Sequence, residues 1–373
     1  MQPKRLNDVL EKAEDRSEQF VSFFTRSWRP IAGGAAALFV LSLLIVWMTI
    51  DHPFSPKEKL IVTSAPVTTT VTSSTGFYRQ LDGVAVADTT STTLLPLGVM
   101  VENSIDAWPL SGVAKANVVF EAPVEGSITR FFLLFDPKTE SGEIGPVRSA
   151  RPYYVDLAST FGSVYAHVGG SPDALNQISK TDGFKNLDQF FNDKYFWRSA
   201  SRYAPHNVYT DVSKLTAAAE KNTWTASPFT SWTYEEIATS TSVGTASTST
   251  IRVPYAGAYA ATWAYDPQTG LYTRSQNHRI QKDADGTVVS VKNVVVIDTD
   301  ETVLDEKGRL SVRMTGTGDV IVAHDGKVIR GTWSRKGGQN FAFTDADGKM
   351  IPLGRGKTWV SIVTSSGLGD IVQ

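Results

Sequence analysis

One stretch of the sequence, residues 121–173, contains most of the side chains that could do chemistry. It holds acids, arginines and a histidine beside two runs with the composition of core strands, 131–135 and 164–166. A polar side chain at the end of a strand is held by a rigid backbone while its tip meets solvent, as a binding or catalytic site requires. The polar residues of this stretch are Glu121, Glu125, Arg130, Arg148, Arg151, Asp156, His167, Ser171 and Asp173.

The arginines are the strongest signal within this stretch. Arg148 and Arg151 lie three residues apart, directly before a helix predicted over 152–159. Guanidinium groups and helix N-termini both favour phosphate or carboxylate ligands, so these two residues and Arg130 predict an anion site. In the alternative, the arginines pair with carboxylates of the same stretch and only stabilise the fold. The carboxylates available for such pairing are Glu121, Glu125 and Asp156.

An enzyme at this site would also need a general base. His167 ends a predicted strand before Gly169-Gly170, where a histidine can be a base or a satisfied structural residue. The Gly-Gly-Ser-Pro-Asp turn that follows contains Ser171 and Asp173. Ser171 is also placed to cap a helix predicted over 172–179. The candidate bases are Glu125, Asp156 and His167.

Two residue pairs outside the stretch are further candidates for the rim of the site. Glu102-Asn103 follows a strand predicted over 97–101, and these residues could equally cap a loop. His206-Asn207 follows Pro205, where a turn and a site are both open interpretations.

Composition excludes several classes of protein. The chain has 373 residues, a net charge of -2 and no cysteine. No overall basic field favours nucleic acid as a partner. The lack of cysteine excludes disulfides, thiol catalysis and an acylated cysteine within this sequence. The 5 histidines have no metal-ligand spacing, and the Asp-Ala-Asp-Gly runs at 283–286 and 345–348 lack the glutamate of a calcium loop. The sequence therefore predicts no metal and no cofactor.

An apolar segment indicates where the protein resides. Residues 31–50 contain no charge, and about twenty apolar residues span a bilayer. A cleaved signal peptide is the alternative, but its apolar region is usually only about 7–15 residues long. Arginines before the segment favour an inside N-terminus. We therefore expect a cytoplasmic tail at 1–30, a transmembrane helix at 31–50, and an extracytoplasmic remainder.

The remainder divides by composition into two predicted domains of an α+β protein. Residues 51–76 form a tether rich in Ser and Thr. Strands and helices mix over 77–225, which predicts an α/β-type domain that contains the candidate site. A second Ser/Thr-rich run lies in a linker at 226–250. Short alternating runs separated by turn residues over 251–373 predict a mostly β domain, a small barrel or a sandwich.

Several motifs resemble the YerB-like lipoprotein family, a bacterial envelope family of unknown function. Residues 144–158 read IGPVRSARPYYVDLA, and residues 166–174 read AHVGGSPDA. The likeness continues at 204–209 (APHNVY), 293–296 (NVVV), 308–309 (GR) and 356–360 (GKTWV). It covers nearly all of 77–365 and implies two domains and an envelope location, but no established reaction. Family members are often lipoproteins, whereas this sequence offers no cysteine to acylate.

The order of elements is also similar to that of the LytR-CpsA-Psr phosphotransferases. A strand is followed by an Asp-Pro-Lys-Thr turn, an arginine-rich loop, a helix, and a strand that ends in Gly-Gly. Those membrane-anchored enzymes move glycans from polyprenyl pyrophosphate to peptidoglycan, and their arginines hold the pyrophosphate. This topological likeness implies a polyprenyl-linked ligand, although likeness of fold does not establish chemistry.

Two functions are therefore open. In the first, the protein binds an anionic, phosphorylated envelope glycan or lipid-linked ligand, with or without glycan phosphotransferase activity. In the second, it is a non-enzymatic scaffold or regulator of cell-wall synthases and uses the same surface to dock a protein. The predicted ligand-binding residues are Glu102, Asn103, Glu121, Arg130, Arg148, Arg151, Ser171, Asp173, His206 and Asn207.

Overall fold

The computed structural model describes residues 76–373 apart from 227–228, 236–249, 365–367 and 369–373. The predicted tail 1–30, the predicted membrane span 31–50 and all but the last residue of the tether 51–76 lie outside the described residues. Most of the predicted linker 226–250 also lies outside them. Within the described part of the chain, no helix has the length and apolarity needed to cross a membrane.

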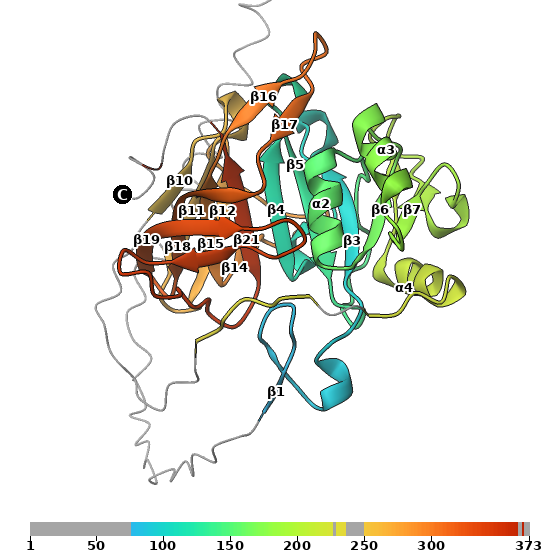
Figure 1. The fold of residues 1–373 in the computed structure, drawn as a ribbon. Helices are drawn as coiled ribbons and strands as arrows, with labels where there is room; N and C mark the ends of the chain where they lie inside the picture. Colours follow the sequence, from blue (N-terminus) through green and yellow to red (C-terminus); the bar gives the residue numbers. More distant parts are fainter. Residues whose placement is uncertain (1–75, 227–228, 236–249, 365–367, 369–373) are drawn as a thin grey trace, which may run out of the picture. The chain divides into compact units, whose positions relative to one another are not determined.

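A ten-stranded mixed sheet is the centre of the fold (Figure 1). The first five strands along it come from residues 251–373 and the last five from residues 77–225. Strand β21 joins the two groups, because it pairs in parallel with β15 on one side and with β4 on the other. The order is β20 (Ala342–Thr344), β19 (Lys327–Arg335), β18 (Gly316–His324), β15 (Asn293–Asp298), β21 (Thr358–Val363), β4 (Val118–Pro123), β5 (Thr129–Phe135), β3 (Leu97–Glu102), β6 (Val164–His167) and β7 (Asn186–Asp188).

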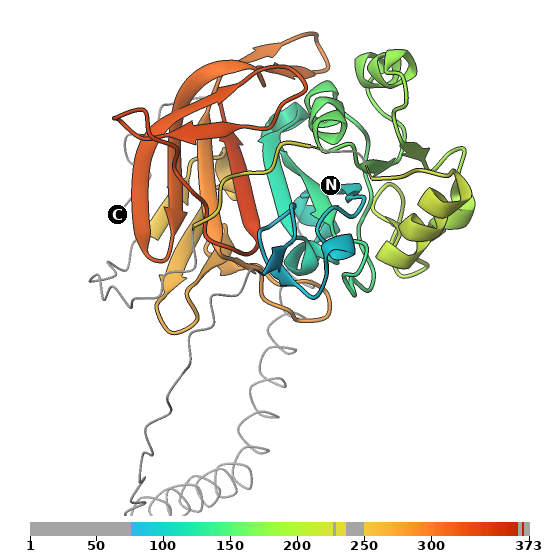
Figure 2. The ribbon, with the colours of Figure 1, turned by 60° about the horizontal axis from the view of Figure 1, so that its bottom comes forward.

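Smaller strands surround this sheet. A second sheet contains β10 (Thr250–Val253), β11 (Ala261–Asp266), β12 (Leu271–Gln276), β13 (Arg279–Ile280) and β14 (Ser290–Val291). Two-stranded pairs are β1 (Phe77–Tyr78) with β2 (Ala85–Val86), β8 (Trp197–Arg198) with β9 (Val208–Tyr209), and β16 (Glu301–Val303) with β17 (Leu310–Val312). The β1–β2 pair lies in blue at the bottom of Figure 1 and comes to the front in Figure 2. The Asn117 amide fixes it there by donating to Asp82 at 2.8 Å.

The helices begin where local signals predict. Helices α2 (Pro152–Thr160) and α3 (Pro172–Lys180) confirm the helices predicted over 152–159 and 172–179, and a third helix, α4, spans Val212–Lys221. The Ser171 hydroxyl caps α3 by accepting from the Ala174 amide at 3.3 Å. The Asp211 carboxylate caps α4 by accepting from the Lys214 amide at 2.7 Å. Short 3-10 turns are η1 (Thr89–Ser91), η2 (Ile105–Ala107), η3 (Val113–Lys115), η4 (Glu125–Ser127), η5 (Asp193–Tyr195) and η6 (Gly257–Tyr259).

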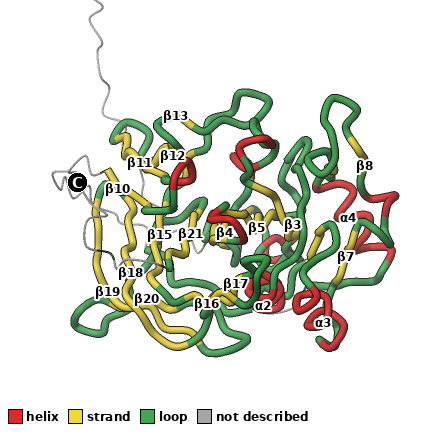
Figure 3. The backbone as a smooth tube through the Cα atoms, turned by 90° about the horizontal axis from the view of Figure 1, so that it is seen from above, coloured by secondary structure: helices red, strands yellow, loops and turns green. Residues whose placement is uncertain are grey.

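Both faces of the large sheet are covered, as Figures 1 and 3 show. Helices α2 and α3 lie on one face, which we call the helix face, and the small sheet and α4 lie on the other. Successive side chains of a strand point to opposite faces, so β5 supplies both cores. Phe132 packs against Tyr154 of α2, whereas Phe131 packs against Trp359 beneath the small sheet.

The expected division into an α/β part and a mostly β part is confirmed. The first part holds the helices and five strands of the mixed sheet, and the second holds strands almost throughout. The strands of the second part divide between two sheets. The small sheet packs its Trp263 and Tyr272 onto the large one. In the predicted linker, Trp232 is buried and Tyr234 pairs with Leu353. The Trp232 ring lies beside Phe120 and Phe161 of the first part and beside Phe343 of the second, so this segment packs against both parts.

Candidate functional site

The candidate site lies where parallel strands of the large sheet end and helices begin. Glu102 ends β3, and His167 ends the neighbouring parallel strand β6. The loops that lead into α2 and α3 run side by side, because Ala150 pairs with Gly170. In open α/β sheets, ligands bind outside the carboxyl ends of the strands. The topology places Glu102 and His167 at this edge of the sheet.

Three arginines meet at this edge on the helix face, and we call them the arginine cluster: Arg130, Arg148 and Arg151. Arg151 forms a two-pronged ion pair with Glu125, with Nε 2.8 Å from Oε1 and Nη2 2.7 Å from Oε2. Arg148 forms an ion pair with Glu102, with its Nε 3.4 Å from Oε2. This contact lacks the geometry of a hydrogen bond.

Glu102 is a buried carboxylate that is only partly used. Its Oε2 lies 2.9 Å from Nδ1 of His206, and its Oε1 is buried without a hydrogen bond. Burial raises the pKa of Glu102 against the opposing effects of Arg148 and His206. Burial alone would also raise the pKa of Glu125, but the hydrogen bonds and the charge of Arg151 outweigh it and lower that pKa.

Arg130 differs from the other two arginines because it has no carboxylate partner among the described residues. It is 6% exposed, and its Nη1 donates to the Ser149 carbonyl at 2.7 Å. Its Nε is buried without a hydrogen bond. Burial, and then repulsion from Arg151 and Arg148, lower the pKa of Arg130 to about 10. A buried charge without a countercharge raises the free energy of the folded state, so a bound anion beside Arg130 would stabilise the protein.

Some hydrogen-bond donors of the cluster have no acceptor among the described residues. Within the described residues, neither terminal nitrogen of Arg148 has a hydrogen bond, and the side chain is 27% exposed. Arg130 uses one of its three guanidinium nitrogens. Three cations stand against two carboxylates here. Partly buried guanidinium groups whose N–H donors have no acceptor can hold a phosphate or carboxylate by paired hydrogen bonds.

A hollow of about 340 Å³ is lined by Val124 and Gly126, the neighbours of Glu125 in the chain. It lies between the β4–β5 connection, which carries Glu125, and the β16–β17 hairpin. Its lining mixes apolar and polar groups, among them Val124, Tyr255, Val303, Leu310 and Glu301.

Glu121 and Asn103 were predicted for the same site, but they lie on the opposite face of the sheet. Glu102 and Asn103 follow one another at the end of β3, so their side chains point to opposite faces. The Asn103 amide donates to Thr129 at 2.7 Å and to Gln276 at 2.8 Å. Glu121 is fully buried beneath the small sheet. The sheet thus divides the predicted ligand-binding residues into two groups.

The partner of Glu121 is Arg274 of β12, which sequence reasoning missed. Its Nη2 lies 2.8 and 2.9 Å from the two carboxylate oxygens, and both side chains are 0% exposed. Trp359 and Thr129 also donate to this carboxylate, at 3.0 and 2.8 Å. An arginine in an alternating strand is typical of a solvent-facing position, so no local signal indicated burial. The network connects the small sheet to β4 and β21.

The other candidate bases have partners of their own. Asp156 pairs with Arg335 of β19 at 2.5 Å. His167 is buried, and its ring nitrogens lie 2.7 Å from the Gly169 carbonyl and 2.7 Å from Oδ1 of Asn186. Both nitrogens of this histidine are therefore used, which favours a structural role. Of the three candidate bases, Glu125 alone contacts the arginine cluster.

The remaining predicted residues lie around the edge. Ser171 is the N-cap of α3, and Asp173 is exposed in its first turn. The Asn207 carbonyl oxygen Oδ1 accepts from Arg198 at 2.9 Å. His206 joins the cluster through Glu102, as described above. The site that the structure assembles is therefore Arg130, Arg148 and Arg151 with Glu102, Glu125 and His206.

Comparison with known proteins places the chain among its relatives. Residues 81–225 match the N-terminal domain of DUF3048, described as a protein of unknown function, and residues 251–360 match the C-terminal domain. A protein of Bacillus subtilis (strain 168) named "Putative lipoprotein YerB" is 33% identical over 275 residues, which cover 72% of this chain and 81% of that protein. A crystal structure of YerB from Bacillus subtilis is similar with a TM-score of 0.70 and 30% identity, and the match covers 80% of this chain and 99% of that one.

The resemblance noted in the sequence is thereby confirmed over both parts of the chain. The N-terminal match contains the group of strands from β3 to β7, and the C-terminal match contains β15, β18, β19, β20 and the start of β21. The chain belongs to the DUF3048 family and is a homologue of the YerB protein of Bacillus subtilis.

Proposed function

We propose that this protein belongs to the bacterial cell envelope and binds an anionic, phosphorylated glycan or lipid-linked ligand at the arginine cluster. The observation that carries the proposal is Arg130, a buried cation without a carboxylate partner among the described residues. A phosphate would supply the missing negative charge. It would also accept hydrogen bonds from those nitrogens of Arg130 and Arg148 that have no acceptor among the described residues. The hollow of about 340 Å³ beside the loop that carries Glu125 is proposed to hold the rest of the ligand.

Catalysis of phosphoryl or glycan transfer is the finer form of this proposal. It would rest on Glu125, because Asp156 and His167 are engaged elsewhere. Glu125 is itself bound to Arg151. An arriving anion would compete with Glu125 for that guanidinium and release the carboxylate to act as a base. Binding is therefore proposed as the function, and transfer as a step that depends on this exchange.

A scaffold or regulator of cell-wall synthases is the second candidate, and exposed aromatic side chains favour it. Phe190 is 64% exposed and Phe191 is 85% exposed, just after β7. The ring of Phe190 lies beside Gly169, in the loop that precedes α3. Large exposed aromatic residues are typical of contact surfaces. In this reading the arginines and the aromatic residues together dock a protein.

The envelope location is proposed from two observations. The homologous protein of Bacillus subtilis carries a lipoprotein name, and lipoproteins are held at a membrane. This sequence has no cysteine to carry a lipid, whereas residues 31–50 have the length and composition of a membrane span. We therefore propose that segment 31–50 anchors the chain, with residues 1–30 inside and residues 51–373 outside.

Ligand-linked stability tests the anion site. We expect a polyprenyl pyrophosphate, added at about 100 times its dissociation constant, to stabilise the full-length chain by about 2.7 kcal/mol. Arg148→Lys should weaken this stabilisation, because lysine keeps the charge but lacks the planar fork. Arg279→Lys is the control, since Arg279 is exposed in β13. Thermal melting with and without ligand is the measurement. A shift produced only by a purified wall synthase would establish the regulator instead.

Protease accessibility tests the topology. Protease added to intact spheroplasts should degrade residues 51–373 and leave residues 1–30 protected, because the positive residues before the segment favour the inside. Immunoblots against tags at the two ends report the outcome. Protection of the large part in intact spheroplasts, with cleavage only after lysis, would refute an envelope location for both candidate functions.

A further inference from the structure

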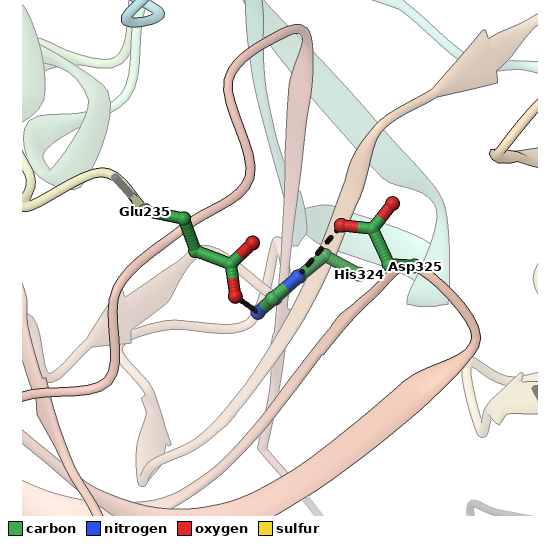
Figure 4. Close-up of side chains that lie close together, drawn as sticks. All are labelled: Glu235, His324 and Asp325. Carbon is green, nitrogen blue, oxygen red and sulfur yellow. Dashed lines mark hydrogen bonds and ion pairs between the residues drawn. The ribbon is translucent and has the colours of Figure 1, made fainter. Parts of the chain in front are cut away.

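A second cluster of side chains lies at the other end of the strands, away from the arginine cluster. His324 ends β18 and pairs with Asn293, the first residue of β15. Strands β15, β21 and β4 are parallel, so Asn293 lies at the edge opposite to the one where β4 ends beside the arginines. Glu235 and Asp325 flank the His324 imidazole (Figure 4). The sequence predicted no metal site, because these three residues have no motif spacing.

The imidazole of His324 is held in one orientation. Its Nδ1 lies 3.2 Å from Oδ2 of Asp325, and Lys292 holds the other oxygen of that carboxylate. Asp325 itself is fixed in the two-residue turn between β18 and β19, where its φ is 52° and that of Gly326 is 72°. A carboxylate that accepts from Nδ1–H leaves the lone pair of Nε2 available to a ligand.

The other nitrogen, Nε2, is buried and has no hydrogen bond. The His324 side chain is 2% exposed, and Oε1 of Glu235 lies 3.8 Å from Nε2. Buried polar atoms are nearly always satisfied, so an orphaned nitrogen that faces a carboxylate needs an explanation. A bound cation between the two atoms would supply one.

We propose that His324 Nε2 and the Glu235 carboxylate bind a divalent transition-metal ion such as Zn²⁺, while Asp325 positions the imidazole. Imidazole and carboxylate are both ligands that zinc accepts. Two ligands of a tetrahedral zinc lie about 3.4 Å apart, given bonds of about 2.0–2.1 Å. The observed separation is 3.8 Å, so a small movement of Glu235 closes the site. Water molecules complete the coordination.

Glu235 can make this movement while its backbone stays fixed. Its amide donates to the Leu353 carbonyl at 2.8 Å, and its carbonyl accepts from Arg355 Nε at 3.1 Å. The side chain is 41% exposed, so solvent and ions reach the carboxylate. The site therefore combines a rigid histidine with one adjustable acidic ligand, which suits a surface site that loads from solution.

Calorimetric titration of the full-length chain with Zn²⁺, after treatment with a chelator, tests this proposal. We expect one saturable zinc site per chain. Glu235→Gln should abolish it, and Asp325→Asn should weaken it about 10- to 100-fold, as loss of a partner that orients a ligating histidine does. Asparagine suits the positive φ of residue 325, so the turn is preserved. His278→Asn is the control for unspecific histidine binding, since His278 is exposed.

Each alternative result overturns the proposal. The proposal fails if the wild type shows no saturable zinc binding. It also fails if the wild type and Glu235→Gln bind zinc with equal affinity, because residue 235 is exposed and the variant should fold normally. Binding of Ca²⁺ but not Zn²⁺ would exclude the histidine as a ligand, because calcium prefers oxygen ligands only. The titration contains no phosphate, so its outcome is independent of the arginine cluster.

Discussion

Replacement of Arg274 by Met destabilises the fold by roughly 3–5 kcal/mol, because Glu121 is then left as a buried carboxylate without a countercharge. Glu121 and Arg274 are both 0% exposed, and Arg274 binds both carboxylate oxygens. The guanidinium also lies 4.8 Å from the centre of the Trp359 ring, so its removal disturbs the aromatic core as well. The pair connects β12 of the small sheet to β4 of the large one, and both sheets lose a contact.

Urea unfolding measures this effect through the change in midpoint. The double variant Glu121→Gln, Arg274→Met should recover much of the lost stability, since replacing both partners of a buried ion pair is often close to neutral. Arg309→Met is the matched control. Its pair with Asp305 lies at the surface, where ion pairs contribute little, so its midpoint should stay near that of the wild type. Equal losses in the single and double variants would show that packing, and not charge, explains the destabilisation.

The helices and turns could be predicted because their signals are local. Ser171 and Asp211 stand directly before α3 and α4, and each caps its helix as the sequence indicates. The Asp325-Gly326 turn joins β18 to β19 as expected of that dipeptide. The run 144–158 carries the family resemblance and also the two arginines, so the position of the site along the chain was predictable as well.

Strand order and side-chain partners could not be predicted, because they depend on pairing between distant segments. Strand β21 near the C-terminus inserts between β15 and β4, and nothing in its sequence distinguishes it from a strand of a separate barrel. Arg274 meets Glu121 across 153 residues. Glu102 and Asn103 were predicted together for one rim, although successive residues of a strand point to opposite faces. The observed pairing of β3 with β5 shows which face Glu102 meets, because Glu102 lies opposite Arg130.

Removal of the Arg130 charge should stabilise the protein and abolish anion binding, which is the second large effect expected. Burial and the neighbouring arginines lower the pKa of Arg130 well below its usual value, to about 10. At about 1.4 kcal/mol per pKa unit, the charged form costs roughly 3 kcal/mol in the folded state. Arg130→Met removes this cost but also loses the hydrogen bond that the charged guanidinium donates to Ser149, worth about 1.5–3 kcal/mol. We therefore expect a net gain of up to about 1.5 kcal/mol.

The anion site should fail in the same variant, because two arginines remain and each is already paired with a carboxylate, Arg148 with Glu102 and Arg151 with Glu125. Functional sites often retain destabilising groups because their ligand needs them. Stability is measured by urea unfolding without ligand, and binding by the pyrophosphate-dependent shift in melting temperature. We expect the first to rise and the second to disappear.

Arg335→Met is the matched control for the sign of this effect. Arg335 is also buried, but it pairs with Asp156 at 2.5 Å and donates to Thr160 and to the Met314 carbonyl. Its removal should destabilise the protein, because those acceptors lose their donor. If Arg130→Met destabilises the protein as Arg335→Met does and the pyrophosphate shift persists, Arg130 only braces the fold. Opposite signs in the two variants, with binding lost only at residue 130, would show that the buried charge is retained for a ligand.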